Sequence, residues 1–529
     1  MALFRAVATV GSYTLLSRVT GFARDVLTAT FLGAGATADA FFVAFQFPNL
    51  FRSLFAEGAF SAGFVPIFSQ ILARDGKDRA RQFADDAFSV LAAVLFVFSV
   101  VMIIAMPVVL IAMAPGFLRI PGQMERATEL ARIAFPYLFF VSLTSLQSGV
   151  LNALDRFAAA AVAPALLNVT LIAALLAGVG AGRDPATFLA WGVLAGGAVQ
   201  FVWLADSCRR IGMRIRLSMP RLSPEVRLLL TRMAPVVIGA GVYQLNLVAN
   251  KVVATLGKEG SVSWLYYADR VNLLPVGVIG VAIGIALVPF LTRKIETGDT
   301  TGALADQNRA IEICLLLTAP AAVGIAVLAE PITSVLFERG AFTPADRAAV
   351  AAALLGFSFG LPAYVLTKAL TPAFFSRHDT RTPVRASVVS LSANIILNLA
   401  LMKWYGHVGI AVATSVAAWI NIGFLVVVMH RRGYLIADQR LKKSLPRMVL
   451  ACLAMGAALV YGSALIVEVY GPLFGAVGAA SGAFGGRALA LAGLIFGGAL
   501  IYGIFIVITG AAHLSDLRVL RRSRGTPPT

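Results

Sequence analysis

The chain has 529 residues, of which 59% are hydrophobic and 13% are charged, and its formal net charge is +18. A soluble protein of this size cannot bury so much apolar surface, so the composition excludes a soluble enzyme and predicts an all-α polytopic membrane protein. The positive charge does not indicate nucleic-acid binding. Most of the cations fall in short loops between apolar segments, where they set membrane topology.

Apolar stretches long enough to cross a bilayer recur along the whole chain, and a helical span takes about 20 residues. We count about 14 of them, at residues 6–32, 38–70, 87–113, 129–153, 158–180, 187–208, 226–256, 262–292, 310–336, 346–374, 384–404, 407–429, 446–469 and 486–510. The second and eighth contain Pro48 and Pro275, which predict kinks or local unwinding.

Loops rich in cations alternate along the chain with loops poor in cations. The stretches 71–86, 209–227 and 431–447 are rich in arginine and lysine, as is the C-terminal tail, whereas 470–484 has none. Cytoplasmic loops carry this excess. The pattern therefore predicts that both termini lie in the cytoplasm, which agrees with an even number of spans.

A weak internal repeat relates the two halves of the chain. Pro136 and Asn168 recur 226 residues later as Pro362 and Asn394. Each half would hold six spans, an even number, so the halves share one orientation. Parallel repeats of this kind build transporters whose substrate site lies between them. We therefore predict three regions, which are an N-lobe at 1–222, a C-lobe at 223–433, and two further helices with a basic tail at 434–529.

Four arginines sit where the first, second and eighth predicted spans should be inside lipid: Arg18, Arg24, Arg52 and Arg270. Each costs roughly 2.5–3.5 kcal/mol at a bilayer centre. A helix that enters the membrane near Val7 carries Arg18 about 16 Å deep, too far to reach the nearer surface easily. Such residues are expected to face a water-filled cavity, and a cationic cavity favours an anionic ligand.

Acidic and polar side chains accompany these arginines, and Arg18 and Asp25 are spaced for an ion pair on one helical face. Two interpretations stay open, an ion-pair network that locks helices together or a site for an anionic substrate. Arginine rather than lysine favours recognition, because the guanidinium fork binds phosphate and carboxylate with two hydrogen bonds. The accompanying residues of the candidate site are Ser17, Asp25, Asp39, Asn49, Glu57 and Asp269.

Other polar groups give weaker signals. Lys251 and Lys368 are further cations near or within spans, and Lys251 either reaches the outer surface or stays inside. The four histidines share no helical face and the three cysteines lie far apart, so we predict neither a metal site nor a cofactor.

Several of these stretches resemble the MurJ/MviN family of lipid II flippases, within the multidrug/oligosaccharidyl-lipid/polysaccharide exporter superfamily. The resemblance implies alternating access and a groove for the lipid tail beside the last two helices. It also assigns cavity roles to Ser17, Arg18, Arg24, Asp39, Arg52, Glu57 and Arg270. The stretches are SRVTGFARD (17–25), ADAFFVAFQFPNLFRSLFAEGAFSAGFVPIF (38–68), YYADRVNLLPVGVIGVAIG (266–284), LFERGAFT (336–343) and FFSRHDTRTPVR (374–385).

The expected function is export of lipid II, the undecaprenyl-pyrophosphate-linked peptidoglycan precursor, to the outer leaflet of the bacterial cytoplasmic (inner) membrane. A flippase for another polyprenyl-linked saccharide is the alternative. A drug or cation antiporter should carry net acid in its cavity, and a membrane glycosyltransferase or phosphatase needs carboxylates or histidines at acid–base or metal spacing. A scaffold would not need arginines in lipid. We expect a transporter rather than an enzyme, active as a monomer, with the phospholipid bilayer around it and the cell-wall synthesis machinery as its candidate protein partner.

Overall fold

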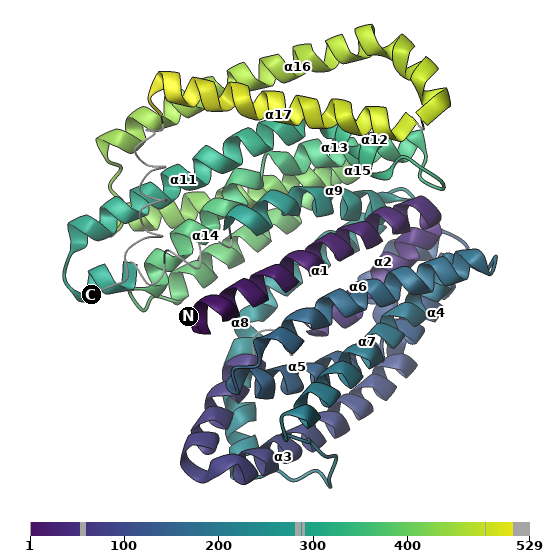
Figure 1. The fold of residues 1–529 in the computed structure, drawn as a ribbon, viewed down its shortest axis with the longest axis vertical. Helices are drawn as coiled ribbons and strands as arrows, with labels where there is room; N and C mark the ends of the chain where they lie inside the picture. The colour runs from purple at the N-terminus through teal and green to yellow at the C-terminus, as the bar shows by residue number, and fades with distance from the viewer. Residues whose placement is uncertain (1, 53–59, 281–286, 288–290, 482, 512–529) are drawn as a thin grey trace. The chain divides into compact units, whose positions relative to one another are not determined.

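A computed structural model describes residues 2–52, 60–280, 287, 291–481 and 483–511. Every regular element in these ranges is a helix, which confirms the predicted all-α class (Figure 1). Contacts between the helices divide the chain into two compact units. The first unit holds Met1–Ser263 with Arg339–Thr343, and the second holds Trp264–Glu338 with Pro344–Thr529.

The first unit is a bundle in which α6 packs against both α1 and α7, α3 packs against α5 and α8, and α2 packs against α4 (Figure 1). Its elements are α1 (Ala2–Leu32), α2 (Ala36–Phe51), α3 (Phe60–Met113), the short helix η2 (Pro115–Arg119), α4 (Gln123–Ala134), α5 (Tyr137–Ala153), α6 (Phe157–Gly180), α7 (Pro185–Arg210) and α8 (Pro224–Thr255).

Local sequence signals fix where two of these helices begin. The Asp184 side chain accepts a hydrogen bond from the Thr187 amide, and Pro185 occupies the first turn of α7. Ser223 caps α8 in the same way, followed by Pro224. A capping oxygen satisfies an amide that has no partner within the helix, and proline has no such amide to satisfy.

The interior of the first unit contains stacked phenylalanines. Phe64 of α3 lies 5.5 Å from Phe68 and 5.3 Å from Phe83 between ring centroids. Farther along α3, the apolar side chains of Phe96 and Ile104 are instead exposed. Exposed apolar side chains on long helices are what a hydrocarbon solvent requires, because the lipid takes the place of a protein core.

A short loop between two helices of the second unit belongs to the first unit. The backbone amide of Ala341 donates to the Thr30 carbonyl of α1 over 2.7 Å. Gly340 has φ +60° and lies so close to α1 that a Cβ atom there would collide with the Thr30 carbonyl oxygen. This packing explains why Arg339–Thr343 group with the first unit although they follow α12.

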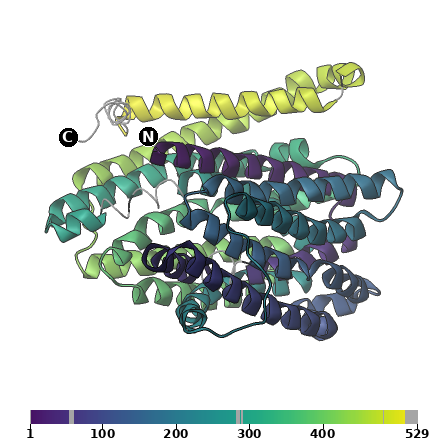
Figure 2. The same cartoon turned by 60° about the horizontal axis from the view of Figure 1, so that its bottom comes forward.

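The second unit packs α11 against α14, α16 and α13, and α16 runs beside α17 (Figures 1 and 2). Its elements are α9 (Ser261–Pro275, whose first three residues belong to the first unit), the π-helical turn η3 (Val276–Gly280), α11 (Thr300–Val327), α12 (Ala329–Phe337), α13 (Pro344–Ser358), α14 (Leu361–Phe375), α15 (Arg381–Arg431), α16 (Gln439–Ser481) and α17 (Ala483–Thr509).

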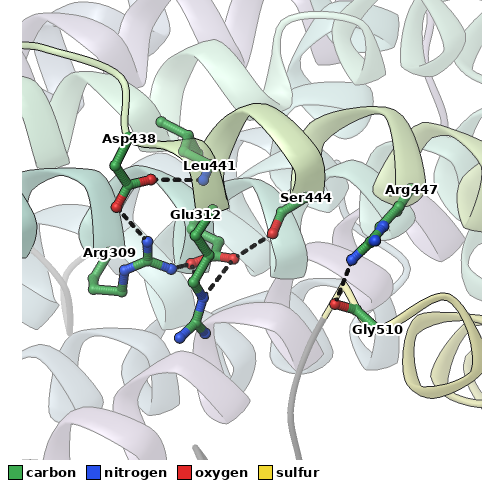
Figure 3. A network of polar contacts seen from close by, with 8 residues as sticks. Arg309, Glu312, Asp438, Leu441, Ser444, Arg447 and Gly510 are labelled. Carbon is green, nitrogen blue, oxygen red and sulfur yellow. Dashed lines mark hydrogen bonds and ion pairs between the residues drawn. The ribbon is translucent and has the colours of Figure 1, made fainter.

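Polar contacts anchor the start of α16 to α11 (Figure 3). The Glu312 carboxylate is buried, pairs with Arg309, and accepts a hydrogen bond from the Ser444 hydroxyl over 2.7 Å. The Arg309 guanidinium also lies 2.7 Å from an Asp438 oxygen. Farther along, Arg447 of α16 donates to the Gly510 carbonyl after α17 over 3.0 Å. The hairpin of α16 and α17 is therefore fixed to the unit by buried charge as well as by apolar packing.

Nine helical segments in the described ranges are long and apolar enough to cross a membrane. Arg381–Arg431 covers two predicted spans, 384–404 and 407–429, because the helix resumes directly after Gly406. Gly63–Met113 covers 87–113 together with the end of 38–70, because the helix resumes directly after Gly76. Parts of the predicted spans 38–70 and 262–292 lie outside the described residues. The count of about 14 therefore stays a prediction.

Matching prolines of the predicted repeat occupy matching places in the two units. Pro136 separates α4 from α5, and Pro362 stands in the first turn of α14, which follows α13 after a two-residue turn. Each pair of helices forms one candidate span, Gln123–Ala153 in the first unit and Pro344–Phe375 in the second. Because a proline cannot donate to the preceding turn, it interrupts both spans in the same way.

Candidate functional site

Arg24 is a buried cation in the first unit, with 9% of its surface exposed. Its Nη2 and Nε atoms lie 2.6 and 3.1 Å from Oδ1 of Asp25. The guanidinium carbon lies 5.8 Å from the centroid of the Phe45 ring on α2. Contacts with an acid and an aromatic face fix the direction of this guanidinium, so its position is set before any ligand arrives.

Asn168 of α6 connects Arg24 of α1 to the rest of the bundle by hydrogen bonds. Its Oδ1 accepts from Arg24 Nη1 over 2.9 Å, and its Nδ2 donates to the Ser17 carbonyl over 3.0 Å. One amide therefore connects two predicted site residues of α1. We did not predict a site role for Asn168 from the sequence, although its recurrence as Asn394 in the repeat marked the position.

Asp25 pairs with its neighbour Arg24 rather than with Arg18. Arg18 is exposed on α1, whereas Arg24 and Asp25 are buried. Arg18 and Asp25 share one side of the helix, but at seven residues apart they are about 10 Å from each other along its axis. The predicted ion pair between Arg18 and Asp25 is therefore wrong, because the two side chains lie in different surroundings.

Arg52 stands at the C-terminal end of α2, where it is half-buried. Its Nε donates to Oδ1 of Asn49 over 3.2 Å, and Asn49 Nδ2 donates to the Phe45 carbonyl over 2.8 Å. These contacts follow one face of α2 on both sides of Pro48. Glu57, the next predicted site residue, lies outside the described residues.

Asp39 is almost completely buried near the start of α2. Its carboxylate accepts from the backbone amides of Gly260 and Ser263, each over 2.8 Å, and from the Ser263 hydroxyl over 2.5 Å. These donors belong to the turn before α9 and its first residues. Asp39 therefore stabilises the N-terminus of α9, and a contact with substrate stays a prediction.

Asp269 and Arg270 belong to the second unit, and both are half-buried on α9. The Arg270 guanidinium carbon lies 4.8 Å from the centroid of the Tyr266 ring, one turn earlier on the same helix. Within the first unit, the structure brings Ser17, Arg24 and Asp25 together around Asn168. Convergence of all four arginines on one cavity stays a prediction.

No group of three histidine, cysteine, aspartate or glutamate side chains with metal-binding geometry occurs in the described part of the chain. The buried polar groups around Arg24 and Arg52 are guanidinium, carboxylate and amide, which suit recognition of an anion. Such an arrangement binds and orients a charged group.

Many apolar helices around a buried guanidinium are typical of a multi-pass membrane protein of the transporter class. The family model described as "Lipid II flippase MurJ" matches residues 28–478. The chain therefore belongs to this family, and it is a multi-pass protein of the bacterial inner membrane.

Curated relatives agree with this assignment. The chain is 42% identical over 524 residues to a probable lipid II flippase MurJ of Rhizobium meliloti, covering 98% of this chain and 96% of that one. It is 38% identical over 438 residues to the lipid II flippase MurJ of Burkholderia cenocepacia, covering 82% and 85%.

The fold resembles that of a solved structure titled as lipid II flippase MurJ in an inward closed conformation. The TM-score is 0.78 at 24% identity, and the match covers 94% of this chain and 98% of that chain. An inward-facing multidrug resistance transporter of the MATE family gives a TM-score of 0.66 at 15% identity, covering 80% and 98%. These likenesses show a shared fold.

Proposed function

We propose that this chain transports lipid II from the inner to the outer leaflet of the cytoplasmic membrane, for peptidoglycan synthesis. Membership of the MurJ family supports the proposal, since its curated relatives carry that activity in their names. The observation in this structure that carries it is the buried Arg24 guanidinium, held by Asp25 and Asn168 within apolar helices. The head of lipid II carries a pyrophosphate and peptide carboxylates, the anions that such a group binds best.

The proposed binding residues are those that the sequence singled out. Arg18, Arg24, Arg52 and Arg270 bind the pyrophosphate, and the neighbouring acids and amides adjust their positions. In this role Asp25 and Asn168 orient Arg24, and Asn49 orients Arg52. The remaining members of the set are Ser17, Asp39, Glu57 and Asp269.

Transport proceeds by alternating access of two parallel lobes, at 1–222 and 223–433. The region 434–529 supplies the groove for the polyprenyl tail beside α16 and α17. Both termini lie in the cytoplasm, in line with the cation-rich loops. The protein acts as a transporter without covalent chemistry and as a monomer, and it works with the cell-wall synthesis machinery.

The test is the leaflet accessibility of lipid II in cells depleted of this protein. We expect lipid II to accumulate in the inner leaflet, and the wild-type chain to restore its export. Arg24→Ala should not restore export at equal abundance, whereas Arg74→Ala should, because the Arg74 side chain is 80% exposed. Normal lipid II export during depletion, with another polyprenyl-linked saccharide retained inside, would favour the alternative substrate.

A further inference from the structure

Lys251 is a cation of α8, and its side chain contacts α2. It lies four residues before the end of α8 at Thr255 and is half-buried. Its Nζ donates to Oε1 of Gln46 over 2.6 Å and to the Phe42 carbonyl over 3.3 Å. Of the two readings that the sequence left open, the structure selects the interior one, with the ammonium held against a neighbouring helix.

The residues that receive Lys251 share a face of α2 with Asn49 and Arg52. At 100° per residue, positions 42, 46, 49 and 52 fall within an arc of roughly 120°. The hydrogen bond from Arg52 Nε to Asn49 Oδ1 runs along this face. Gln46 and Arg52 are separated by roughly 9 Å along the helix axis, at 1.5 Å per residue.

Arg24 approaches the same face from α1, because its guanidinium lies over Phe45. Cations from three helices therefore meet one face of α2, namely Arg24 from α1, Arg52 from α2 itself and Lys251 from α8. All three belong to the first unit. Cations inside a span are costly, and those that face the interior of a helix bundle mark substrate or ion pathways.

The chemistry of the Lys251 contacts suits a group that changes partner. Two of the acceptors that contact Lys251, Gln46 Oε1 and the Phe42 carbonyl, are neutral, and Arg24 on the same face is paired with the Asp25 carboxylate. A lysine has a flexible four-carbon stem and a compact charge that accepts any anionic oxygen, without the fixed geometry of a guanidinium. Lys251 can therefore move from an amide to an anion at small conformational cost.

We propose that Lys251 is a further substrate-binding residue, which contacts an anionic oxygen of the lipid-linked head at the α2 face, and that Gln46 positions its ammonium before the substrate arrives. This proposal rests on the proposed function. The alternative is a brace between α2 and α8 that makes no contact with substrate.

The experiment measures binding of lipid II to the purified full-length protein in lipid nanodiscs. Lys251→Met should weaken binding about tenfold, since a hydrogen bond to a charged group contributes about that much. Lys251→Arg keeps the charge and should retain most of the affinity. Lys258→Met is the matched control, because Lys258 is exposed just beyond the same helix, and it should bind like the wild type.

A second ligand shows which part of the substrate Lys251 contacts, and a variant of Gln46 shows what this residue contributes to binding. Undecaprenyl pyrophosphate lacks the sugar and peptide, so an equal loss with this ligand assigns the contact to pyrophosphate. A loss with lipid II alone assigns it to a peptide carboxylate, and either result supports the proposal. Gln46→Leu should weaken binding less than Lys251→Met does, because it leaves the charge in place.

Wild-type affinity of Lys251→Met for lipid II, together with a lowered thermal unfolding midpoint, would overturn the proposal in favour of the brace. Lys251→Gln gives the same comparison where the methionine variant does not fold. Absence of lipid II binding by the wild-type protein would instead overturn the proposed function, and this inference with it.

Discussion

Arg24 of α1 and Asn168 of α6 are joined by a hydrogen bond of 2.9 Å between Nη1 and Oδ1. The amide nitrogen of the same asparagine donates to the Ser17 carbonyl, so Asn168 bridges two turns of α1. Asp25 accepts hydrogen bonds from Nε and Nη2 of the same guanidinium, so Asp25 and Asn168 together hold its orientation. This arrangement makes Asn168 a positioning residue for the cation.

Asn168→Asp should weaken lipid II binding while the protein stays folded. The substitution keeps the size of the side chain but places a carboxylate beside Arg24, which offsets the charge that an anion would meet. We expect about a tenfold loss of affinity, which corresponds to roughly 1.4 kcal/mol. The measurement is lipid II binding in nanodiscs, with the thermal unfolding midpoint as the control. Unchanged affinity would show that Arg24 does not bind the head.

Replacing Arg24, Arg52 or Arg270 singly by lysine should impair transport without loss of abundance. The charge survives each substitution, but the planar fork that makes two hydrogen bonds to a phosphate does not. Loss of one charge-assisted hydrogen bond lowers transport about tenfold. Restoration of lipid II export by all three lysine variants in depleted cells would indicate a diffuse cationic field instead.

The sequence predicted the cations of the site better than their partners. An arginine in an apolar span stands out by its insertion cost alone, so Arg24 was found without a structure. Its contact with Asn168 joins residues 144 positions apart. The contacts of Asp39 with Gly260 and Ser263 span more than 220 positions. No local pattern encodes such pairs, because an asparagine or aspartate in a helix can face any of several neighbours.

The sequence predicted the long apolar helices from the length of their apolar stretches. It predicted the ends of the helices less well. The charged stretch 71–86 was expected to be a loop, yet α3 continues through it apart from Gly76, which has φ +82°. The stretch has three arginines and three alanines, which are good helix formers outside the membrane as well. Likewise, the predicted span 310–336 is divided into α11 and α12 near Leu328.

Gly340→Ala should destabilise the protein more than Gly182→Ala. Both glycines have φ near +60°, which costs an alanine about 1–2 kcal/mol. A Cβ atom at Gly182 would have no neighbour within 4 Å, whereas at Gly340 it would collide with the Thr30 carbonyl and displace the loop from α1. Thermal unfolding of the two variants in detergent measures the difference. Equal midpoints would show that the contact between Arg339–Thr343 and α1 contributes little.

The Asp379 carboxyl should make a pH-dependent contribution to stability. Partial burial raises its pKa, but hydrogen bonds from Thr382 and the Arg432 guanidinium outweigh this and hold the pKa at about 2, below its usual value of 3.8. A depressed pKa stabilises the folded state above the unfolded pKa, and this stabilisation is lost as the pH falls through the folded pKa. Asp379→Asn should therefore lower the unfolding midpoint at neutral pH, and the difference from the wild type should shrink between pH 3.8 and about 2. A difference that stays constant over this range would contradict the assignment.

Pro275→Ala should slow transport while leaving the protein at least as stable. Proline has no amide hydrogen, so the Val271 carbonyl receives no helical hydrogen bond from position 275, and the π-helical turn Val276–Gly280 follows directly. Alanine restores that hydrogen bond and favours a straight, stiff helix, which resists the bending that alternating access requires.

Pro164→Ala is the matched control. Pro164 also stands inside a helix, but α6 continues past it as an α-helix to Gly180, so this substitution should preserve lipid II export. Export by Pro275→Ala at the wild-type rate, in depleted cells with equal protein abundance, would show that bending of α9 at Pro275 is not part of the transport cycle.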